Sequence, residues 1–526
     1  MNQVHWLDLS LIIAYLVGLI IFGIYISRGV KSGSDYFLAG KSLPFWVIGM
    51  SIIGTNIGSN DYVGSAGNAY EIGLAQANFE WIGAIPAMVL GAFLFLPYYW
   101  RAGVYSIPEY LGKRYDERTR FLSAIIFTAF SFVIVGVFLW ATALMLHTYL
   151  GWSHWVGILV TGVVVGFYTI SGGLKAVTYS DTVQLVIMFG GSLGVAYFGI
   201  EQAGGLDSFF HKLTTEHPDK LRVFLPADHP DFPWPGVLLG LAMVLSPAYW
   251  CANQAVLQRT LAARSQWDSQ ASMLFAAFAK TFIPLLIILP GFLVLVLSAD
   301  PLPDKDQALP WIIKNVLPPG LSGLLFVAFI AALQSSVDST LNSASTMFTR
   351  DIYGVWKANF KRSGKEEAAE TEARENLELR MGRWVTFVGL VFGMAFAPVT
   401  GEFGGIYTFI QESLALFQGP VLAILTLGIL SRRPTPSGGF MALLLGIVVA
   451  AILRLGLEWN MLYVAFGSAV FSSVFLFAAR YFTDPPNPDH IQGLTLRSVI
   501  PASGIDTGNS RAPSSESGET GRDDHA

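Results

Sequence analysis

The segment spanning residues 45–67 constrains the fold of this chain more than any other. It is apolar and long enough to cross a membrane, but residues 54–61, GTNIGSND, interrupt its centre with polar and glycine residues. Lipid offers no hydrogen-bond partners, so irregular polar backbone is tolerated at membrane depth only where protein buries it or where it lines a water-filled site. The interruption is therefore a candidate binding site.

The composition indicates an integral membrane protein. Of the 526 residues, 53% are hydrophobic and 13% are charged, and the mean hydropathy of +0.52 is far above that of an average soluble domain. The first apolar run is too long, and lacks the small-residue cleavage site, for a cleavable signal peptide. Windows of about 20 apolar residues predict an all-α fold with thirteen spans, at 7–27, 45–67, 76–99, 121–149, 154–170, 178–203, 235–258, 269–298, 321–349, 384–400, 405–430, 437–456 and 460–482.

The basic residues predict the orientation of these spans. With the N-terminus outside, most of the 32 Lys and Arg residues fall on the inside, as the positive-inside rule requires. We therefore predict a multi-pass protein of the plasma membrane with a cytoplasmic C-terminus. Segment 204–234 would be an extracellular loop, and 483–526, which is rich in Pro, Ser, Gly and Asp, a mostly disordered cytoplasmic tail.

A second span is interrupted in the same way. Within 235–258, the run SPAYWCANQ at 246–254 places a proline and several polar side chains in an apolar segment. Paired interruptions of this kind point to a transporter site at the membrane midplane. Taking the two spans as the first helices of two five-helix halves gives an inverted repeat, 45–203 and 235–430, preceded by one extra helix within 1–44 and followed by two within 431–482.

Oxygen-bearing side chains follow one face of the predicted helix 321–349. Positions 332, 335, 339 and 342 recur at helical spacing, and Ser336 and Asp338 lie beside them. Hydroxyls, together with carbonyls of an interrupted helix, are the hard ligands that a sodium ion prefers, although serines facing other helices can also be packing contacts. Asp338 needs a cation, a partner or a proton, because a carboxylate at a helix centre costs about 3 kcal/mol.

Three further charges attract attention. Asp181 opens a predicted helix, where it could bind a cation or simply stabilise the helix N-terminus. Lys280 lies within the apolar run 275–282, so it should face the protein interior, either as a donor to solute hydroxyls or as a structural partner of Glu80 or Glu412. Glu80 beside Trp81 suits sugar recognition and also suits an interfacial aromatic belt.

Other classes of function have little support. The eight histidines fall in loops, tails or helix ends, so the spans offer no metal cluster or catalytic relay, and there is no Walker A motif for an ATP-driven pump. The single Cys251 leaves no thiol pair for redox chemistry, and a net charge of −5 argues against nucleic acid as a partner. We predict a secondary active transporter rather than an enzyme.

Four separated motifs carry a family resemblance: DYFLAG at 35–40, SGGL at 171–174, QRTLAA at 258–263 and NSAST at 342–346. Together they resemble the sodium/solute symporter family, and most of all its sodium/glucose cotransporters, from about residue 7 to 480. The resemblance implies the LeuT-type inverted-repeat fold. It also implies a sodium site formed by the carbonyls of Gly54, Ile57 and Ala332 and the hydroxyls of Ser335 and Ser336.

The resemblance implies two more sites. A second sodium ion, present in some members, would lie at Asp181 and Ser339 beside Asp338, a residue that is not expected at that position. The solute would contact Asn56, Glu80, Ser246, Tyr249, Trp250, Lys280 and Gln411, with the Tyr249 ring closing the inner side. Asp61 departs from the sugar cotransporters, which carry His or Gln there.

The resulting prediction is a sodium-coupled symporter that imports a glucose- or galactose-like hexose by alternating access. Its partners would be sodium ions, a small solute and membrane lipid, with no nucleic acid. Two alternatives stay open: a sodium symporter for another solute such as an inositol, a sialic acid or a carboxylate, and a sugar sensor of the same fold that does not transport.

Overall fold

A computed structural model describes residues 5–58, 60–356, 368–401 and 406–496, and the regular secondary structure in this part of the chain is helical, apart from one isolated β-bridge between Leu43 and Ala263. The α-helices are α1 (Trp6–Ser27), α2 (Gly33–Leu38), α3 (Phe45–Asn56), α4 (Ala66–Ile72), α5 (Ile85–Leu90), α6 (Leu96–Ala102), α7 (Ile107–Arg114), α8 (Glu117–Leu150), α9 (His154–Gln202), α10 (Leu206–Glu216), α11 (Trp234–Gly236), α12 (Ser246–Ala252), α13 (Gln254–Leu261), α14 (Gln266–Lys280), α15 (Ile283–Ile287), α16 (Leu289–Leu297), α17 (Ala308–Asn315), α18 (Leu321–Met347), α20 (Ala368–Thr400), α21 (Ile406–Ala415), α22 (Gln418–Leu430), α23 (Pro436–Ala451) and α24 (Met461–Ala478). Short 3₁₀ and π segments extend or join them at Ala39–Lys41, Asn60–Ser65, Gly73–Phe79, Gly91–Phe95, Pro218–Leu221, Val237–Leu245, Lys305–Gln307, Phe348–Tyr353, Ile452–Gly456 and Ala479–Tyr481.

Among the described helices, 8 are long and apolar enough to cross a membrane, and counting three bent pairs as one span each gives up to 11. Two shorter apolar helices, Phe45–Asn56 and His154–Phe167, occupy the remaining predicted positions, so each of the thirteen predicted ranges overlaps a helix. A 12-residue helix is only about 18 Å long at 1.5 Å per residue, against a hydrocarbon core of about 30 Å. The count of thirteen crossings and the five-plus-five repeat therefore stay predictions.

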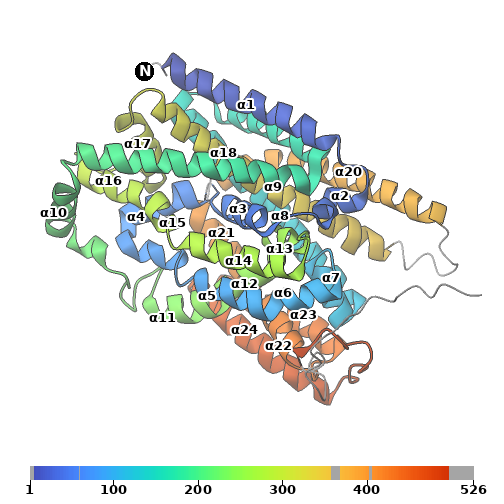
Figure 1. The fold of residues 1–526 in the computed structure, drawn as a ribbon. Coiled ribbons are helices and arrows are strands. Elements are labelled where there is room, and N and C mark those ends of the chain that lie inside the picture. The colour runs from blue at the N-terminus through green and yellow to red at the C-terminus, as the bar shows by residue number, and fades with distance from the viewer. Residues whose placement is uncertain (1–4, 59, 357–367, 402–405, 497–526) are drawn as a thin grey trace, which may run out of the picture.

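The helices surround α18. In Figure 1, α1 lies at one edge of the molecule, where it packs against α9 and α18, and α22, α23 and α24 pack together at the opposite edge. Between these edges, α18 also contacts α3, α8 and α20. Its most apolar 18-residue window is 89% buried, and this explains how a helix with many hydroxyl groups can cross the membrane: protein rather than lipid surrounds it.

Both predicted interruptions are present. Helix α3 ends at Asn56, and the chain resumes as a π segment and then α4. Helix α12 ends at Ala252, and Asn253 adopts an extended conformation (ψ 119°) before α13 begins. The polar runs at 54–61 and 246–254 thus break regular helices inside the fold, as expected for segments that line a site.

Some predicted boundaries were wrong. The helix expected at 76–99 begins only at Ile85, because Pro86 favours the first turn of a helix, and Glu80 lies in the turn that precedes it. The helices expected at 154–170 and 178–203 are both present as the two parts of α9, which meet at a kink at Gly173, but the second part begins at Gly172, six residues earlier than predicted. Gly173 has φ 56°, and a Cβ there would lie 2.6 Å from the Tyr36 carbonyl oxygen, so only glycine fits.

Other predicted segments differ in extent. Helix α20 begins at Ala368, well before the predicted 384, because the polar residues of its first turns extend the helix beyond its apolar part. The predicted loop 204–234 contains the 11-residue helix α10. Most of the predicted tail, 497–526, lies outside the described residues.

Candidate functional site

A cavity of about 160 Å³ lies where the two interrupted helices meet. Its walls come from α3, α8, α12–α13, α14, α18 and α21–α22, with the turn that carries Glu80. Seven of the eight predicted solute-binding residues line it: Asn56, Glu80, Ser246, Tyr249, Trp250, Lys280 and Gln411. The backbone of Asp61, the eighth, lies in the Asn60–Ser65 π segment, and its side chain is outside the described part of the structure.

Lys280 and Glu80 form a buried ion pair in the wall of this cavity. Their side chains are 1% and 5% exposed, and the Lys280 ammonium also lies 5.6 Å from the centroid of the Trp250 ring. Lys280 is the last residue of α14, where the helix bends by 49° towards α15, so its side chain reaches the cavity at the bend. Of the two partners considered for Lys280, Glu80 is the one it contacts, whereas Glu412 pairs with Arg454.

The cavity wall contains polar atoms that lack a partner. Asn56 Nδ2 donates to the Tyr249 hydroxyl (3.3 Å), which joins the two interrupted helices. Asn56 Oδ1, Ser246 Oγ and Gln418 Oε1 are buried without a hydrogen-bond partner among the described residues, and all three residues line the cavity. Because buried polar atoms are normally paired, these oxygens indicate where a polar solute would bind.

The residues of the predicted sodium site lie where the end of α3 faces the middle of α18. Ser336 Oγ donates to the Thr55 carbonyl oxygen (3.1 Å) and to that of Ala332 (3.2 Å), so the hydroxyl already lies among the oxygens of both helices. Beyond the end of α3 at Asn56, Ile57 has a non-helical conformation (φ −80°, ψ 74°). Carbonyls in the last turn of a helix have no intrahelical partner and are therefore available to a cation.

The approach of α3 to α18 depends on Gly58. A Cβ at this position would lie 2.4 Å from Ser336 Oγ, closer than a Cβ atom approaches a non-bonded oxygen, so the serine would have to move. No group of three or more His, Cys, Asp and Glu residues that could hold a metal ion occurs in the described residues. Hydroxyls and carbonyls of Gly54, Ile57, Ala332, Ser335 and Ser336 are neutral oxygen ligands, which fit a monovalent cation such as sodium.

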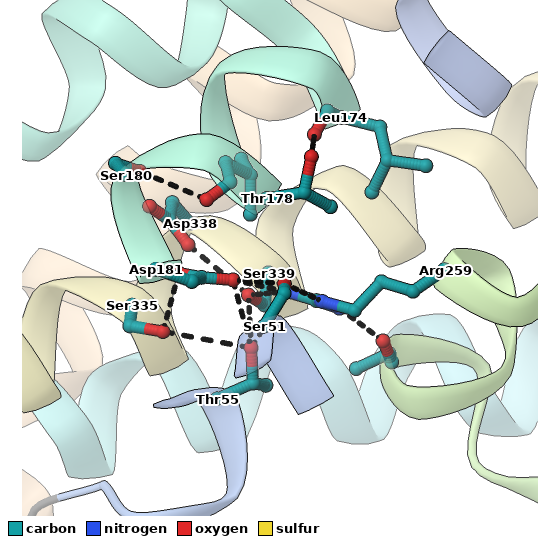
Figure 2. A network of polar contacts seen from close by, with 12 residues as sticks. Ser51, Thr55, Leu174, Thr178, Ser180, Asp181, Arg259, Ser335, Asp338 and Ser339 are labelled. Atoms are coloured by element: carbon teal, nitrogen blue, oxygen red, sulfur yellow. Dashed lines mark hydrogen bonds and ion pairs between the residues drawn. The ribbon is translucent and has the colours of Figure 1, made fainter. Parts of the chain in front are cut away.

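A fully buried arginine lies beside this site, at the centre of a polar network (Figure 2). Arg259, from α13, donates from Nε to Ser51 Oγ (2.6 Å) and from Nη2 to Thr55 Oγ1 (2.6 Å), both on α3. The same Nη2 contacts Asp181 Oδ2 of α9 (3.1 Å) and the Ser339 hydroxyl of α18. The guanidinium thus contacts two of the three residues predicted to hold a second sodium ion.

The two acidic residues of this region are both buried. Asp181 accepts hydrogen bonds from Ser335 Oγ (2.6 Å) and Ser51 Oγ (2.5 Å), and Asp338 Oδ1 accepts one from Ser339 Oγ (3.1 Å). Ser335 therefore connects the predicted sodium ligands with Asp181. Asp181 is not in the first turn of a helix, because it lies nine residues after Gly172, where the second part of α9 begins.

Sequence reasoning assigned no role to Arg259. It appeared only within the QRTLAA motif, although a signal was available: an arginine lies shortly after an interruption in an apolar span, where a buried charge requires a partner. The partner itself could not be found from the sequence, because Asp181 is 78 positions away.

The motifs that carried the family resemblance meet in space. Gln258 Nε2 donates to the carbonyl oxygen of Phe37 (2.7 Å), to Asn342 Oδ1 (2.8 Å) and to Thr346 Oγ1 (2.8 Å), which joins the first, third and fourth motifs. Gly173, in the second motif, packs against Tyr36. These motifs hold α2, α9, α13 and α18 together, and Asn342, which was predicted on the oxygen-rich face of α18, contributes to this junction.

Comparison with known proteins gives a consistent result. Residues 36–446 match the model of the sodium:solute symporter family. The chain is 32% identical over 480 residues to a sodium/glucose cotransporter of Vibrio parahaemolyticus, covering 86% of each protein, and 30% identical to sodium/glucose cotransporter 1 of Mus musculus, covering 84% of this chain and 70% of the relative.

Solved structures agree on the fold. The substrate-bound, outward-open structure of a Na⁺-coupled sialic acid symporter superposes with a TM-score of 0.80 at 23% identity, covering 91% of this chain and 99% of the other. The nucleobase-cation-symport-1 family transporter Mhp1 superposes with a TM-score of 0.57 at 12% identity, over 87% and 97% of the chains. These likenesses confirm the predicted LeuT-type fold.

Proposed function

Because this chain belongs to the sodium:solute symporter family, in which sodium is the coupling ion, we propose that it imports a neutral, polyhydroxylated solute of the glucose and galactose class together with sodium. The chain is a multi-pass membrane protein, and its orientation, with the N-terminus outside, and its place in the plasma membrane belong to the same proposal. Transport would proceed by alternating access, in which sodium binding favours the state that takes up solute from outside.

One observation supports a hydroxyl-rich solute above the others. The cavity combines a self-neutralised ion pair, Lys280 with Glu80, and buried oxygens of Asn56 and Ser246 that lack a partner within the described chain. Such oxygens favour a ligand that donates hydrogen bonds, which is what sugar hydroxyls do. Sites that hydrogen-bond a solute in this way discriminate strongly, because a solute without the matching group leaves buried polar atoms unpaired.

Sodium can be coupled to the solute through residues that belong to both sites. Thr55 and Ser336 line the cavity, and the hydroxyl of Ser336 contacts the Thr55 carbonyl at the predicted sodium site. An ion bound between α3 and α18 would fix the cavity wall in the shape that the solute needs. Each sodium ion crossing 100 mV supplies about 2.3 kcal/mol, enough for a roughly forty-fold solute gradient.

We further propose that one sodium ion, at Gly54, Ile57, Ala332, Ser335 and Ser336, drives each cycle. The guanidinium of Arg259 contacts Asp181 and Ser339, and it supplies there the positive charge that a second sodium ion would otherwise bring. A second ion at Asp181, Asp338 and Ser339 would have to displace this side chain.

A carboxylate solute, such as a sialic acid, is the alternative that the structural neighbour suggests. A buried anionic solute requires an unpaired positive charge, and Lys280, the lysine of the cavity wall, is already neutralised by Glu80. The neutral cavity therefore favours sugars and inositols over carboxylates.

Uptake into proteoliposomes tests the proposal. We expect an inward sodium gradient to drive accumulation of labelled D-glucose, with D-glucose and D-galactose competing well, myo-inositol poorly and N-acetylneuraminic acid not at all. If N-acetylneuraminic acid alone competes strongly, the proposed solute is wrong and the protein transports a carboxylate. Binding of D-glucose without sodium-dependent flux would instead indicate a sensor. In the transporter, Gln411→Ala should weaken the apparent free energy of sugar binding in uptake by about 1–3 kcal/mol, the cost of leaving one buried polar group unpaired.

A further inference from the structure

The cavity continues beyond the predicted solute site. Along α18 its lining residues run from Ser336 through Thr340 to Met347, and along α12–α13 they run from Ser246 to Ala255. The stretch from Ser336 to Met347 corresponds to about 16 Å at 1.5 Å per residue. One wall of the cavity therefore extends three turns of helix past the level at which Asn56, Glu80 and Lys280 gather.

Gln418, the first residue of α22, lies at this far level. The last turn of α22 contacts the end of α7, because Arg114 Nε donates to the Gly428 carbonyl (2.7 Å). Helix α8 begins just after α7, and its Arg120 contacts Asp351 (2.8 Å), in the segment that follows α18. Hence α22 runs towards the end of the molecule where α18 ends. Gln418 follows Gln411 by seven positions in this direction, across the 46° bend that separates α21 from α22.

The other polar side chains near this level are already engaged. The amide of Gln254 accepts from the Ile107 N–H (3.0 Å) and donates to the Tyr105 carbonyl (2.9 Å). The Thr340 hydroxyl donates to the Ser336 carbonyl, and the Ser131 hydroxyl donates to that of Phe127. These groups hold the wall together.

Gln418 differs from them. Its side chain lines the cavity, the residue is 5% exposed, and its Oε1 has no hydrogen-bond partner within the described chain. The adjacent Phe417 packs its ring against Phe127 (5.7 Å between centroids) and Phe130 (5.0 Å), so an apolar aromatic wall flanks the unpaired oxygen. An aromatic wall with one convergent polar group is a typical small-molecule subsite.

We propose that Gln418 forms a second solute subsite, below the first, at which its side-chain oxygen accepts a hydrogen bond from a hydroxyl of the solute. Rotation about the terminal torsion of the side chain, which has a broad energy minimum, turns the oxygen into the cavity. This inference rests on the proposed function, since it needs a hydroxylated solute. The second subsite would hold the solute on its way out and favour its release from Gln411.

Equilibrium dialysis of the purified full-length chain with labelled D-glucose tests the inference. We expect two molecules of D-glucose bound per chain at saturation. Gln418→Met, which has a similar length but no amide, should weaken one binding phase about five-fold or more, the loss of one neutral hydrogen bond, and leave the other unchanged. Gln411→Ala, the matched control on the neighbouring helix α21, should weaken the other phase.

The outcomes separate the two proposals. If the wild-type chain binds no D-glucose, the proposed function fails. If it binds one molecule per chain, or if Gln418→Met leaves both phases unchanged, the second subsite is excluded while the sugar assignment stands. The wild-type stoichiometry decides the matter even if Gln418→Met does not fold.

Discussion

Arg259 Nη2 lies 3.1 Å from Asp181 Oδ2, and both side chains are completely buried. The same nitrogen contacts Thr55 and Ser339, so one guanidinium joins α3, α9, α13 and α18 beside the predicted sodium site. Asp338 is also buried and accepts a hydrogen bond from Ser339, whose hydroxyl the guanidinium contacts. The region is therefore sensitive to any change in charge, and a sodium ion at the predicted site would not face an uncompensated Asp181 carboxylate.

Replacing the arginine should make folding depend on sodium. In Arg259→Gln, Asp181 loses its buried counter-charge, so we expect the sodium-free protein to lose about 3–5 kcal/mol of stability and saturating sodium to restore much of it. Thermal unfolding in detergent, with and without sodium, measures this. Arg114→Gln is the control, because that buried arginine bonds backbone carbonyls of Gly428, Ser431 and Pro434 and its loss should not respond to sodium. Equal sodium effects in the two variants would contradict the role of Arg259.

The ratio of sodium to solute should be one. If Arg259 provides the second positive charge, labelled sodium and labelled D-glucose should enter proteoliposomes in equal numbers. Arg259→Gln should raise the ratio towards two, because Asp181, Asp338 and Ser339 then accept an ion, and Asp181→Asn in that background should bring it back to one. A wild-type ratio of two would assign the second sodium ion to those three residues despite the arginine.

Loss of the Ser336 hydroxyl should weaken sodium binding. Ser336→Ala removes one ligand at a position where the hydroxyl bridges α18 and the Thr55 carbonyl, so we expect a rise of about ten-fold, equivalent to about 1.4 kcal/mol, in the sodium concentration for half-maximal uptake. Ser343→Ala is the matched control, because within the described part of the chain its hydroxyl bonds only the Ser339 carbonyl, one turn back in the same helix. An unchanged sodium dependence in a well-expressed Ser336→Ala protein would remove this serine from the site.

A methyl group added at Gly58, across from Ser336, should disturb the same predicted sodium site. In Gly58→Ala the new Cβ would fall 2.4 Å from Ser336 Oγ and push the hydroxyl away from its place. We expect the sodium requirement for uptake to rise as in Ser336→Ala, and the double variant to be no worse than either single one, because coupled changes are not additive. Gly190→Ala, which adds a methyl group to α9 with nothing within 4 Å, should leave uptake unchanged. Additive effects of Gly58→Ala and Ser336→Ala would show that Gly58 acts elsewhere.

The ion pair in the cavity should tolerate loss of both charges better than loss of one. Lys280→Met leaves Glu80 buried and unpaired, which should lower the stability of the protein by about 3–5 kcal/mol. Glu80→Gln leaves the Lys280 ammonium buried and unpaired, with a similar loss of stability. The double variant should recover most of that stability in thermal unfolding, while sugar uptake should stay low in all three proteins because each has lost at least one charged group of the cavity wall. A double variant less stable than both single variants would show that the residues do not act as a pair.

Much of the fold was determined by local sequence. The long apolar runs predicted α1, α8 and α24, and glycine and polar residues at 54–61 and 246–254 predicted the two interruptions, because backbone in lipid must be helical unless protein or water satisfies it. The motifs identified the family, and the face of α18 that carries Ser335 and Ser339 followed from helical spacing alone. Boundaries such as the late start of α5 were missed, because apolar residues before Ile85 look like helix in a hydropathy window.

The tertiary structure alone decided which charges meet. Lys280 had two possible partners in the sequence, and only the fold brought Glu80, 200 positions away, into contact with it. Arg259 had no visible partner, and the position of Asp181 well inside the second part of α9, rather than at its start, came from the early beginning of that part at the Gly173 kink. Hydropathy and spacing act over a few turns of helix, whereas a buried pair depends on how distant helices pack, and that information is not local.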